Sequence, residues 1–335
     1  MIATGAVRLT EYASCGGCAA KYSAALLQEL VSQLPVEADP DLLVGLAPSD
    51  DAAVYRLDDE RALAFTVDFF PPIVDDPGDF GAIAAANALN DVFAMGAMPL
   101  VALSVAAFPE SLPAEAVSAV FAGAAAKVRE AGGVLAGGHT LRDEEPLYGL
   151  AVVGMVSPRA IWTKAGARSG DALYLTKPLG TGLIVHGRKE GRVADAVLAP
   201  AVELMKTLNL EAARELRELE PHAVTDVTGF GLLGHAYELA TRSGVHIDLD
   251  AHALPVIPGA LELAELGVVT GGDPRNREYV GGALTVDGAS EAQVRLAFDP
   301  QTAGGLLVAL PPGRAFAAGV RIGSVAEGEG VRLSA

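Results

Sequence analysis

Hydrophobic and polar positions alternate along the first half of the chain in patterns typical of mixed strands and helices. Period-2 and short apolar runs predict strands, and apolar residues spaced by three and four positions predict helices. We predict strands at residues 52–57, 62–70, 100–108, 133–135 and 147–156. We predict helices at residues 79–95, with Asp79 as the N-cap, and 114–131, ended by Gly132 and Gly133.

The second half of the chain also contains both strand and helix patterns, and an irregular segment separates it from the first half. Pro158, Gly166 and Gly170 interrupt the pattern between residues 157 and 169, which indicates a domain boundary there. Beyond it we predict strands at 172–176, 245–249, 283–286, 305–309 and 320–325, and helices at 194–208, at 211–219 and after Gly231. Before residue 47 only one amphipathic pattern, at 23–34, predicts a helix, and no strand is expected. The chain is therefore predicted to be α+β, with a segment 1–47 and two domains, 48–157 and 158–335.

Composition agrees with a globular protein and excludes some partners. Of the 335 residues, 51% are hydrophobic and 20% charged, and the net charge is −18. Such a charge repels nucleic acid and anionic membranes, so neither is an expected partner. The apolar stretch 82–108 contains Asn87, Asn90, Asp91 and Pro99, which predicts a buried helix followed by a strand, not a membrane span. Two cysteines make no disulfide framework, and the absence of an early apolar run favours a cytoplasmic location.

Four aspartates stand in apolar surroundings where surface acids seldom occur: Asp51, Asp68, Asp91 and Asp226. A buried anion requires a cation or several hydrogen bonds. Carboxylate oxygens suit magnesium, which bridges carboxylates to phosphate oxygens. A single buried aspartate is more often a cap or turn residue, but four together favour a ligand site.

Asn87 and Asp91 are four residues apart on one face of a predicted helix, so that face points towards something polar. Two glycine pairs, in residues 135–140 and 299–307, permit a close backbone approach to a ligand, although tight turns explain such pairs equally well. His139 taken alone favours a structural role. There is no Walker motif and no strand-linked Gly-x-Gly-x-x-Gly, so any nucleotide is bound by another architecture.

The two cysteines, Cys15 and Cys18, leave three interpretations open. A redox dithiol normally follows a strand, and none precedes this pair. A zinc half-site would need a second half, which no other cysteine of this chain supplies. The third interpretation is one reactive thiol, Cys18, whose thiolate is favoured by the ammonium of Lys21 three residues later.

A series of motifs runs through nearly the whole chain. The first are Cys-Gly-Gly-Cys-Ala-Ala-Lys at 15–21, Ser-Asp-Asp-Ala-Ala-Val-Tyr at 49–55, Thr-Val-Asp-Phe-Phe-Pro-Pro-Ile-Val-Asp at 66–75 and Asn-Ala-Leu-Asn-Asp-Val-Phe-Ala-Met-Gly at 87–96. The series continues with Ala-Gly-Gly-His-Thr at 136–140, Leu-Thr-Lys-Pro-Leu-Gly-Thr-Gly at 175–182, Thr-Asp-Val-Thr-Gly-Phe-Gly at 225–231 and Asp-Pro-Gln-Thr-Ala-Gly-Gly at 299–305. With these motifs the chain resembles the selenophosphate synthetases, also called selenide, water dikinases. Several of these motifs are shared with aminoimidazole ribonucleotide synthetase, thiamine monophosphate kinase and a hydrogenase-maturation protein. Cys-Ala-Ala-Lys is the discriminating element.

The resemblance implies a two-domain aminoimidazole ribonucleotide synthetase-like fold whose N-terminal domains pair into a β-barrel in a homodimer. It implies a reaction in which ATP, selenide and water give selenophosphate, AMP and orthophosphate, with Mg²⁺ as cofactor. Cys18 and Lys21, on a mobile glycine-rich segment 1–47, match the family's catalytic residues. Magnesium would be held by Asp51, Asp91 and Asp226. The nucleotide would be bound by Lys21, Pro48, Ser49, Asp50, Asp68, Asp91, Gly137, Gly138 and His139, the last three reaching ATP on the partner subunit. Cys15 receives no essential role.

Two rival functions remain to be separated from this one. The first is a kinase or ligase of the same superfamily that acts on a carbon-based substrate, with Cys18 incidental. The second is a non-catalytic thiol protein that carries a metal or selenium. The second gives no reason for acids distributed through both halves of the chain.

Overall fold

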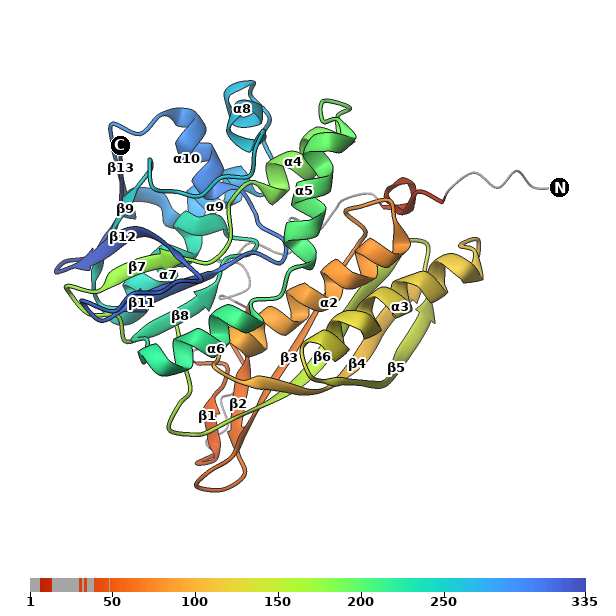
Figure 1. The fold of residues 1–335 in the computed structure, drawn as a ribbon, viewed down its shortest axis with the longest axis horizontal. Helices are drawn as coiled ribbons and strands as arrows, with labels where there is room; N and C mark the ends of the chain where they lie inside the picture. The colour runs from red at the N-terminus through yellow and green to blue at the C-terminus, as the bar shows by residue number, and fades with distance from the viewer. Residues whose placement is uncertain (1–6, 14–29, 32, 35–38, 48) are drawn as a thin grey trace.

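The computed structural model describes residues 7–13, 30–31, 33–34, 39–47 and 49–335. Two β-sheets, each with helices packed against it, form the body of the molecule (Figure 1). No helix within the described residues has both the length and the apolar character needed to cross a membrane.

The first sheet has six strands in the order β1-β2-β3-β6-β4-β5. Neighbouring strands are antiparallel, except that β4 and β5 run parallel. The strands are β1 (Leu42–Val44), β2 (Ala53–Arg56), β3 (Ala62–Phe70), β4 (Met98–Phe108), β5 (Val134–Arg142) and β6 (Leu147–Val156).

Helices α2 (Pro77–Ala94) and α3 (Ala114–Glu130) cover one face of this sheet (Figure 1). Every residue of α2 from Phe80 to Asn90 is buried, because the helix packs against the sheet, α3 and the second half of the chain. The two helices approach closely at Gly81, where a Cβ atom would lie 1.9 Å from the backbone oxygen of Val120.

The second sheet has seven strands in the order β10-β13-β9-β12-β7-β11-β8. They are β7 (Ala172–Leu175), β8 (Ala223–Asp226), β9 (His246–Asp250), β10 (Leu284–Asp287), β11 (Leu306–Leu310), β12 (Val320–Ala326) and β13 (Gly330–Ser334). The helices of this half are α4 (Thr181–Lys189), α5 (Asp195–Lys206), α6 (Leu210–Leu219), α7 (Gly231–Ser243), α8 (Ala260–Glu265), α9 (Asp273–Val280) and α10 (Glu291–Phe298).

The hydrophobic core that surrounds α2 continues into the second half. Met205 of α5 and Leu216 of α6 belong to it, as do Val224 of β8 and Leu306 of β11. A second core lies on the other side of the second sheet, under α7 and α10. Helix α2 therefore lies between the two sheets, and its polar residues face the end of β8 and the start of β11.

Most elements confirm the sequence prediction, with several corrections. The N-cap of α2 is Asp76, whose side chain accepts a hydrogen bond from the Asp79 N–H at 2.8 Å, so the prediction of Asp79 was wrong. Pro77 at the first helical position is already preorganised for the helix, which explains the earlier start. Strand β1 lies where no strand was expected, and β5 is much longer than the predicted 133–135. The helix predicted at 23–34 lies largely outside the described residues.

Candidate active site

Asp51 precedes β2 and contacts the second half of the chain. Its Oδ1 lies 2.8 Å from Lys164 Nζ and accepts a hydrogen bond from Thr225 Oγ1 at 3.2 Å. The Asp51 side chain is only 4% exposed. Thr225 is the residue before Asp226 at the end of β8, so β8 brings both residues towards the start of β2. Asp51, a predicted magnesium ligand, thus lies at the contact between the two halves, next to the strand end that carries Asp226.

Asp50 and Ser49 contact the second half as well. Asp50 Oδ2 accepts a hydrogen bond from the backbone N–H of Lys164 at 3.0 Å, and Arg242 donates to the backbone oxygen of Ser49 at 3.1 Å. Burial, reinforced by the Asp51 charge, raises the pKa of Asp50 to about 6. Of the stretch predicted to bind the nucleotide, Pro48 lies outside the described residues.

Asp68 and Asp91 are brought together by β3 and α2. Asp68 Oδ2 accepts a hydrogen bond from Asn87 Nδ2 at 2.6 Å, and Asp91 Oδ2 accepts one from Thr66 Oγ1 at 2.5 Å. Thr66 and Asp68 point to the same side of β3, and Asn87 and Asp91 are one turn apart on α2. The sequence expectation that this face of the helix meets polar groups is confirmed.

Asp91 lies within range of the charges of three other aspartates. Burial raises the pKa of Asp91 well above its usual value, and the carboxylates of Asp226, Asp68 and Asp51 raise it further. Each of these three carboxylates therefore lies near Asp91. The carboxyl groups that the sequence singled out therefore form one cluster, contributed by β3, α2, β8 and the residues before β2.

A second set of polar contacts fixes α2 to the loop before β11. Asn87 Oδ1 accepts a hydrogen bond from the Ala303 N–H at 2.8 Å, and Asn90 and Asn209 donate to the Gly304 oxygen at 3.1 and 2.8 Å. Lys177 donates to the Ala303 oxygen at 2.6 Å. The glycine pair at 304–305 is thus held against the carboxylate cluster.

The sequence reasoning missed the lysines of this region. Burial lowers the pKa of Lys177 to about 7, and the Asp226 carboxylate opposes this shift, so the two groups are neighbours. For Lys164, burial likewise disfavours the charge, but Asp51 and Glu238 raise the pKa well above its usual value. Single lysines in apolar or loop segments give no periodic signal. Lys177 was noticed only inside the motif 175–182.

The carboxylate oxygens of the cluster are chemically suitable ligands for magnesium, but they do not form a complete coordination shell. Within the residues that the structure describes, no group of three or more His, Cys, Asp or Glu is placed to hold a metal ion by itself. Magnesium is usually bound by one or two carboxylates together with waters and substrate phosphates, so an all-protein cage is not required. Asp51 Oδ2 is buried and has no hydrogen-bond partner in the described part of the chain. A buried carboxylate oxygen of this kind suits a cation.

The structure places Gly137, Gly138 and His139 away from this cluster within one chain. They lie on β5, the exposed edge strand, three strand positions from β3 and so roughly 14 Å across the sheet. Gly138 has φ +151°, and a Cβ there would lie 2.1 Å from the Ser104 backbone oxygen, so only glycine fits.

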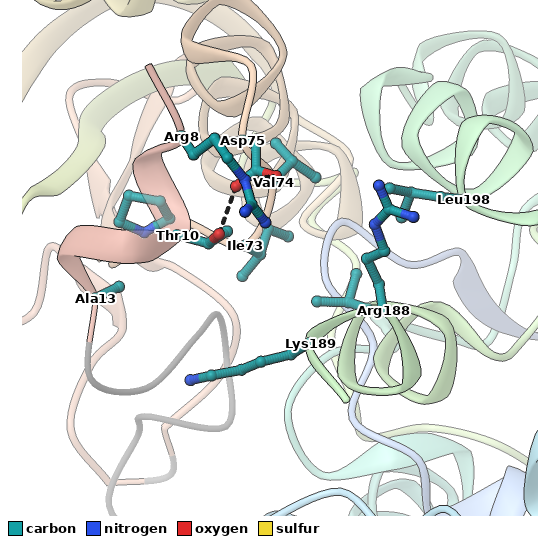
Figure 2. A pocket seen from close by; sticks show the side chains of 11 residues that line it. Arg8, Thr10, Ala13, Ile73, Val74, Asp75, Arg188, Lys189 and Leu198 are labelled. Atoms are coloured by element: carbon teal, nitrogen blue, oxygen red, sulfur yellow. Dashed lines mark hydrogen bonds and ion pairs between the residues drawn. The ribbon is translucent and has the colours of Figure 1, made fainter. Parts of the chain in front are cut away.

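The predicted catalytic residues Cys18 and Lys21, like Cys15, lie outside the described residues. The chain just before them is attached to the body at Asp75. Arg8 Nε lies 3.2 Å from Asp75 Oδ2, and Thr10 Oγ1 donates to Asp75 Oδ1 (Figure 2). The Leu9 N–H donates to the Asp75 backbone oxygen at 3.3 Å.

A cavity of about 140 Å³ lies beside this attachment, between the short 3₁₀ helix η1 (Leu9–Tyr12) and α4. Arg188 and Lys189 of α4 line it from the opposite side (Figure 2). Asp51, Asp68, Asp91 and Asp226 are not among the residues that line this cavity.

Comparison with known proteins first defines the class. The model "AIR synthase related protein, N-terminal domain" matches residues 49–156, and the model "AIR synthase related protein, C-terminal domain" matches residues 168–323. A solved thiamine monophosphate kinase from Aquifex aeolicus has the same fold, with a TM-score of 0.68, 20% identity, and coverage of 92% of this chain and 94% of that one. The protein thus has the two-domain α+β fold of the AIR synthase-related proteins.

Sequence relatives then give the family. Over 304 residues the chain is 48% identical to the selenide, water dikinase of Caldanaerobacter subterraneus subsp. tengcongensis, covering 91% of this chain and 88% of the relative. It is 45% identical over 314 residues to that of Myxococcus xanthus, covering 93% and 89%. The chain belongs to the selenide, water dikinase family.

Proposed function

We propose that this protein makes selenophosphate from selenide, ATP and water and releases AMP and orthophosphate. Its family membership, at 48% identity over nearly the full chain, supports the reaction. The single structural observation that carries the proposal is the grouping of Asp51, Asp68 and Asp226 around Asp91, which brings carboxylates from both halves of the molecule together where Asp51 contacts Lys164 and Thr225.

In this proposal the residues of the cluster hold Mg²⁺ and the nucleotide phosphates. Asp51, Asp91 and Asp226 are the proposed magnesium ligands, and the ion, when bound, neutralises phosphate charge that the aspartates would otherwise repel. The proposed nucleotide-binding residues are Lys21, Pro48, Ser49, Asp50, Asp68, Asp91, Gly137, Gly138 and His139.

The described residues orient the carboxylates of the cluster. Asn87 fixes the Asp68 carboxylate, and Thr66 fixes that of Asp91. Phosphoryl transfer depends mainly on positioning and on charge stabilisation, so such fixed carboxylates are the protein's main contribution. Cys18 is proposed to handle the selenium species, and Lys21 to neutralise phosphate charge.

We propose that the active form is a homodimer joined through the outer face of the first sheet. The face opposite α2 and α3 carries apolar side chains, with Val67 58% and Leu103 45% exposed. An open cavity of about 410 Å³ lies there, lined by Phe65, Thr66, Val67, Val101, Leu103, Ala151, Val152 and Val153. A soluble monomer seldom exposes such a continuous apolar surface. A second copy pairing over it would form the β-barrel expected of the family and bring the β5 edge of one subunit towards the other.

The remaining sequence predictions belong to the same proposal. The segment 1–47 carries the reactive residues, 48–157 binds ATP and forms the dimer, and 158–335 supplies Asp226 and the residues that fix Asp51. A cytoplasmic location, without nucleic-acid or membrane partners, accords with the net charge of −18.

The decisive experiment is an anaerobic incubation with ATP, Mg²⁺ and selenide, followed by phosphorus NMR. We expect a selenium-bonded phosphorus signal together with AMP, and we expect Cys18→Ser to lose at least about 100-fold in rate, as removal of a nucleophile or carrier does. If ATP is consumed only with a carbon-based acceptor, the protein is another kinase of the fold class. If there is no ATP turnover at all, the carrier function is favoured.

A further inference from the structure

A buried ionic chain leads from Asp51 into α7. Lys164 Nζ lies 2.8 Å from Asp51 Oδ1 and 3.5 Å from Glu238 Oε2. Glu238 Oε2 in turn lies 3.4 Å from His235 Nδ1. None of these four side chains is more than 19% exposed. Lys164, Glu238 and His235 have no place in the motif-based ligand set.

A backbone hydrogen bond determines which ring nitrogen of His235 carries the proton. His235 Nε2 accepts a hydrogen bond from the Thr228 N–H at 3.1 Å. Because a backbone N–H can only donate, Nε2 carries no proton, and the proton of the neutral ring sits on Nδ1, facing Glu238. Glu238 Oε2 therefore lies between the protonated Nδ1 of His235, 3.4 Å away without a hydrogen bond, and the Lys164 ammonium, 3.5 Å away. The Glu238 carboxylate thus contacts Lys164, and His235 lies next to Glu238.

The two carboxylate oxygens of Asp51 therefore differ in whether they can still bind a cation. Oδ1 contacts both Lys164 and Thr225, whereas Oδ2 is buried without a hydrogen-bond partner in the described part of the chain. A fixed Oδ1 sets the plane of the carboxylate and so the direction in which Oδ2 points. The arrangement leaves one oxygen oriented for an incoming cation.

The cluster also needs a counter-charge before any divalent cation binds. Asp91 experiences the charges of Asp226, Asp68 and Asp51, and like charges at such range oppose one another. The Lys164 ammonium lies in direct contact with one member of the cluster.

We infer that Lys164 is a positioning residue for the proposed magnesium site: it balances the Asp51 charge in the metal-free protein and fixes Oδ1, and Glu238 and His235 hold it there. This inference rests on the proposed function, because it assumes that Asp51 meets a divalent cation. Lys164 acts through Asp51 and needs no contact with substrate.

A purely structural ion pair joining the two halves would behave differently. Such a pair stabilises the fold by the same amount with and without metal. A lysine that shares Asp51 with a cation repels that cation, so the two contributions are coupled. Removal of the Lys164 charge should therefore destabilise the metal-free protein and increase the stabilisation that a divalent cation supplies.

The test measures thermal unfolding with and without Mg²⁺, and Mn²⁺ binding by the loss of the free-ion EPR signal, in the absence of ATP and selenide. For Lys164→Met we expect the melting temperature without metal to fall by roughly 5–10 °C, as for loss of one partner of a buried pair. We expect the upward shift on Mg²⁺ addition to be at least about twice that of the wild type, and Mn²⁺ to bind about 5-fold more tightly. Lys164→Arg, which keeps the charge, should stay close to the wild type in both measurements.

Two variants guard the interpretation. Lys206→Met removes another partly buried lysine, whose Nζ lies 2.7 Å from Asp79 Oδ1 and 2.6 Å from Glu203 Oε1, and its melting temperature should fall by an amount that Mg²⁺ does not change. Glu238→Gln leaves the Lys164 charge less balanced, so Mn²⁺ should bind more weakly. The expected change in Mn²⁺ affinity is opposite to that of Lys164→Met, so Glu238→Gln tests the inference even if Lys164→Met does not fold.

The inference is overturned if Lys164→Met loses the same stability with and without Mg²⁺, if Glu238→Gln does not weaken Mn²⁺ binding, or if the wild type responds to neither ion. These results would leave the selenophosphate assay and the role of Cys18 untouched, because neither substrate is present.

Discussion

Asp299 is an acidic residue in surroundings that disfavour its charged form. It follows α10 and is 1% exposed. Its Oδ2 accepts hydrogen bonds from the Leu183 N–H at 3.1 Å and from Gln301 Nε2 at 2.9 Å, while Oδ1 has no partner within the described residues. Burial raises the pKa of Asp299 to about 8, although those hydrogen bonds oppose the shift. The side chain is therefore protonated in the folded protein at neutral pH.

This predicts a pH dependence of stability. A carboxyl group with a raised pKa binds its proton more tightly in the folded than in the unfolded state, so the stability it supports is complete below pH 4 and is lost as the pH rises to about 8. Between pH 5.5 and pH 8 this amounts to about 3 kcal/mol. Asp299→Asn, which imitates the protonated form, should remove most of that fall, as measured by urea unfolding at the two pH values. A variant whose stability falls as steeply as the wild type would contradict the assignment.

The sequence indicated the aspartates of the candidate site but not the lysines that contact them. An aspartate inside an apolar strand or helix, such as Asp68 or Asp91, breaks a local pattern and can be noticed. Lys164 stands in a loop, and its partner Asp51 is more than 100 positions away in the chain. No local pattern records such a pairing, so the relation between Lys164, Asp51 and Glu238 required the structure.

At the scale of elements, the contact between α2 and α3 depends on glycine. An alanine at Gly81 would place its Cβ 1.9 Å from the Val120 backbone oxygen, which cannot move without shifting α3. We expect Gly81→Ala to lower the free energy of unfolding by about 2–4 kcal/mol, the cost of forcing two packed helices apart. The measurement is urea unfolding followed by circular dichroism.

The matched control is Gly282→Ala. A Cβ at Gly282 would meet nothing within 4 Å, and its backbone does not adopt a positive φ. The free energy of unfolding should therefore change by no more than about 0.5 kcal/mol. Equal losses in the two variants would show that close helix packing at Gly81 is not what limits stability.

Elements with a strong local pattern could be predicted, and those that depend on tertiary contact could not. The long runs that became β3, α2 and α3 were predicted closely. Helix α4 was missed because it contains Gly182 and Gly187, which weaken a helix signal. Gly182 is required there, since a Cβ would lie 2.4 Å from Asp299 Oδ1. Strand β13 was missed because its five residues gain their order from parallel pairing with β9 and β10, far away in the chain.

For the whole molecule, two α+β domains were predicted, but the core that both halves share was not. The core around α2 takes side chains from both halves, including Leu306 and Val308 of the second sheet. Hydrophobic patterns show that a strand has a buried face but not what buries it. The same limit applies to the outer face of the first sheet, because the nearly continuous apolar sequence of β3 is typical of a strand with two covered faces.

The exposed apolar face of the first sheet allows the proposed dimer to be tested by mutation. Val67 is 58% exposed on β3, and Phe65 and Phe69 beside it on the same face are 41% and 46% exposed. In the proposed dimer this face is buried against a second copy. A glutamate there would bury a charge without a partner, which typically costs several kcal/mol.

We therefore expect Val67→Glu to elute as a monomer in size-exclusion chromatography with light scattering, at concentrations where the wild type is a dimer. The matched control is Val286→Glu on β10, 45% exposed on the other sheet, which should remain dimeric because the proposed interface does not include it. If His139 of one subunit serves the nucleotide of the other, the monomer should also lose selenide-dependent AMP formation while keeping its melting temperature within about 3 °C. A Val67→Glu protein that stays dimeric would place the subunit contact elsewhere, and the apolar face would then need another occupant.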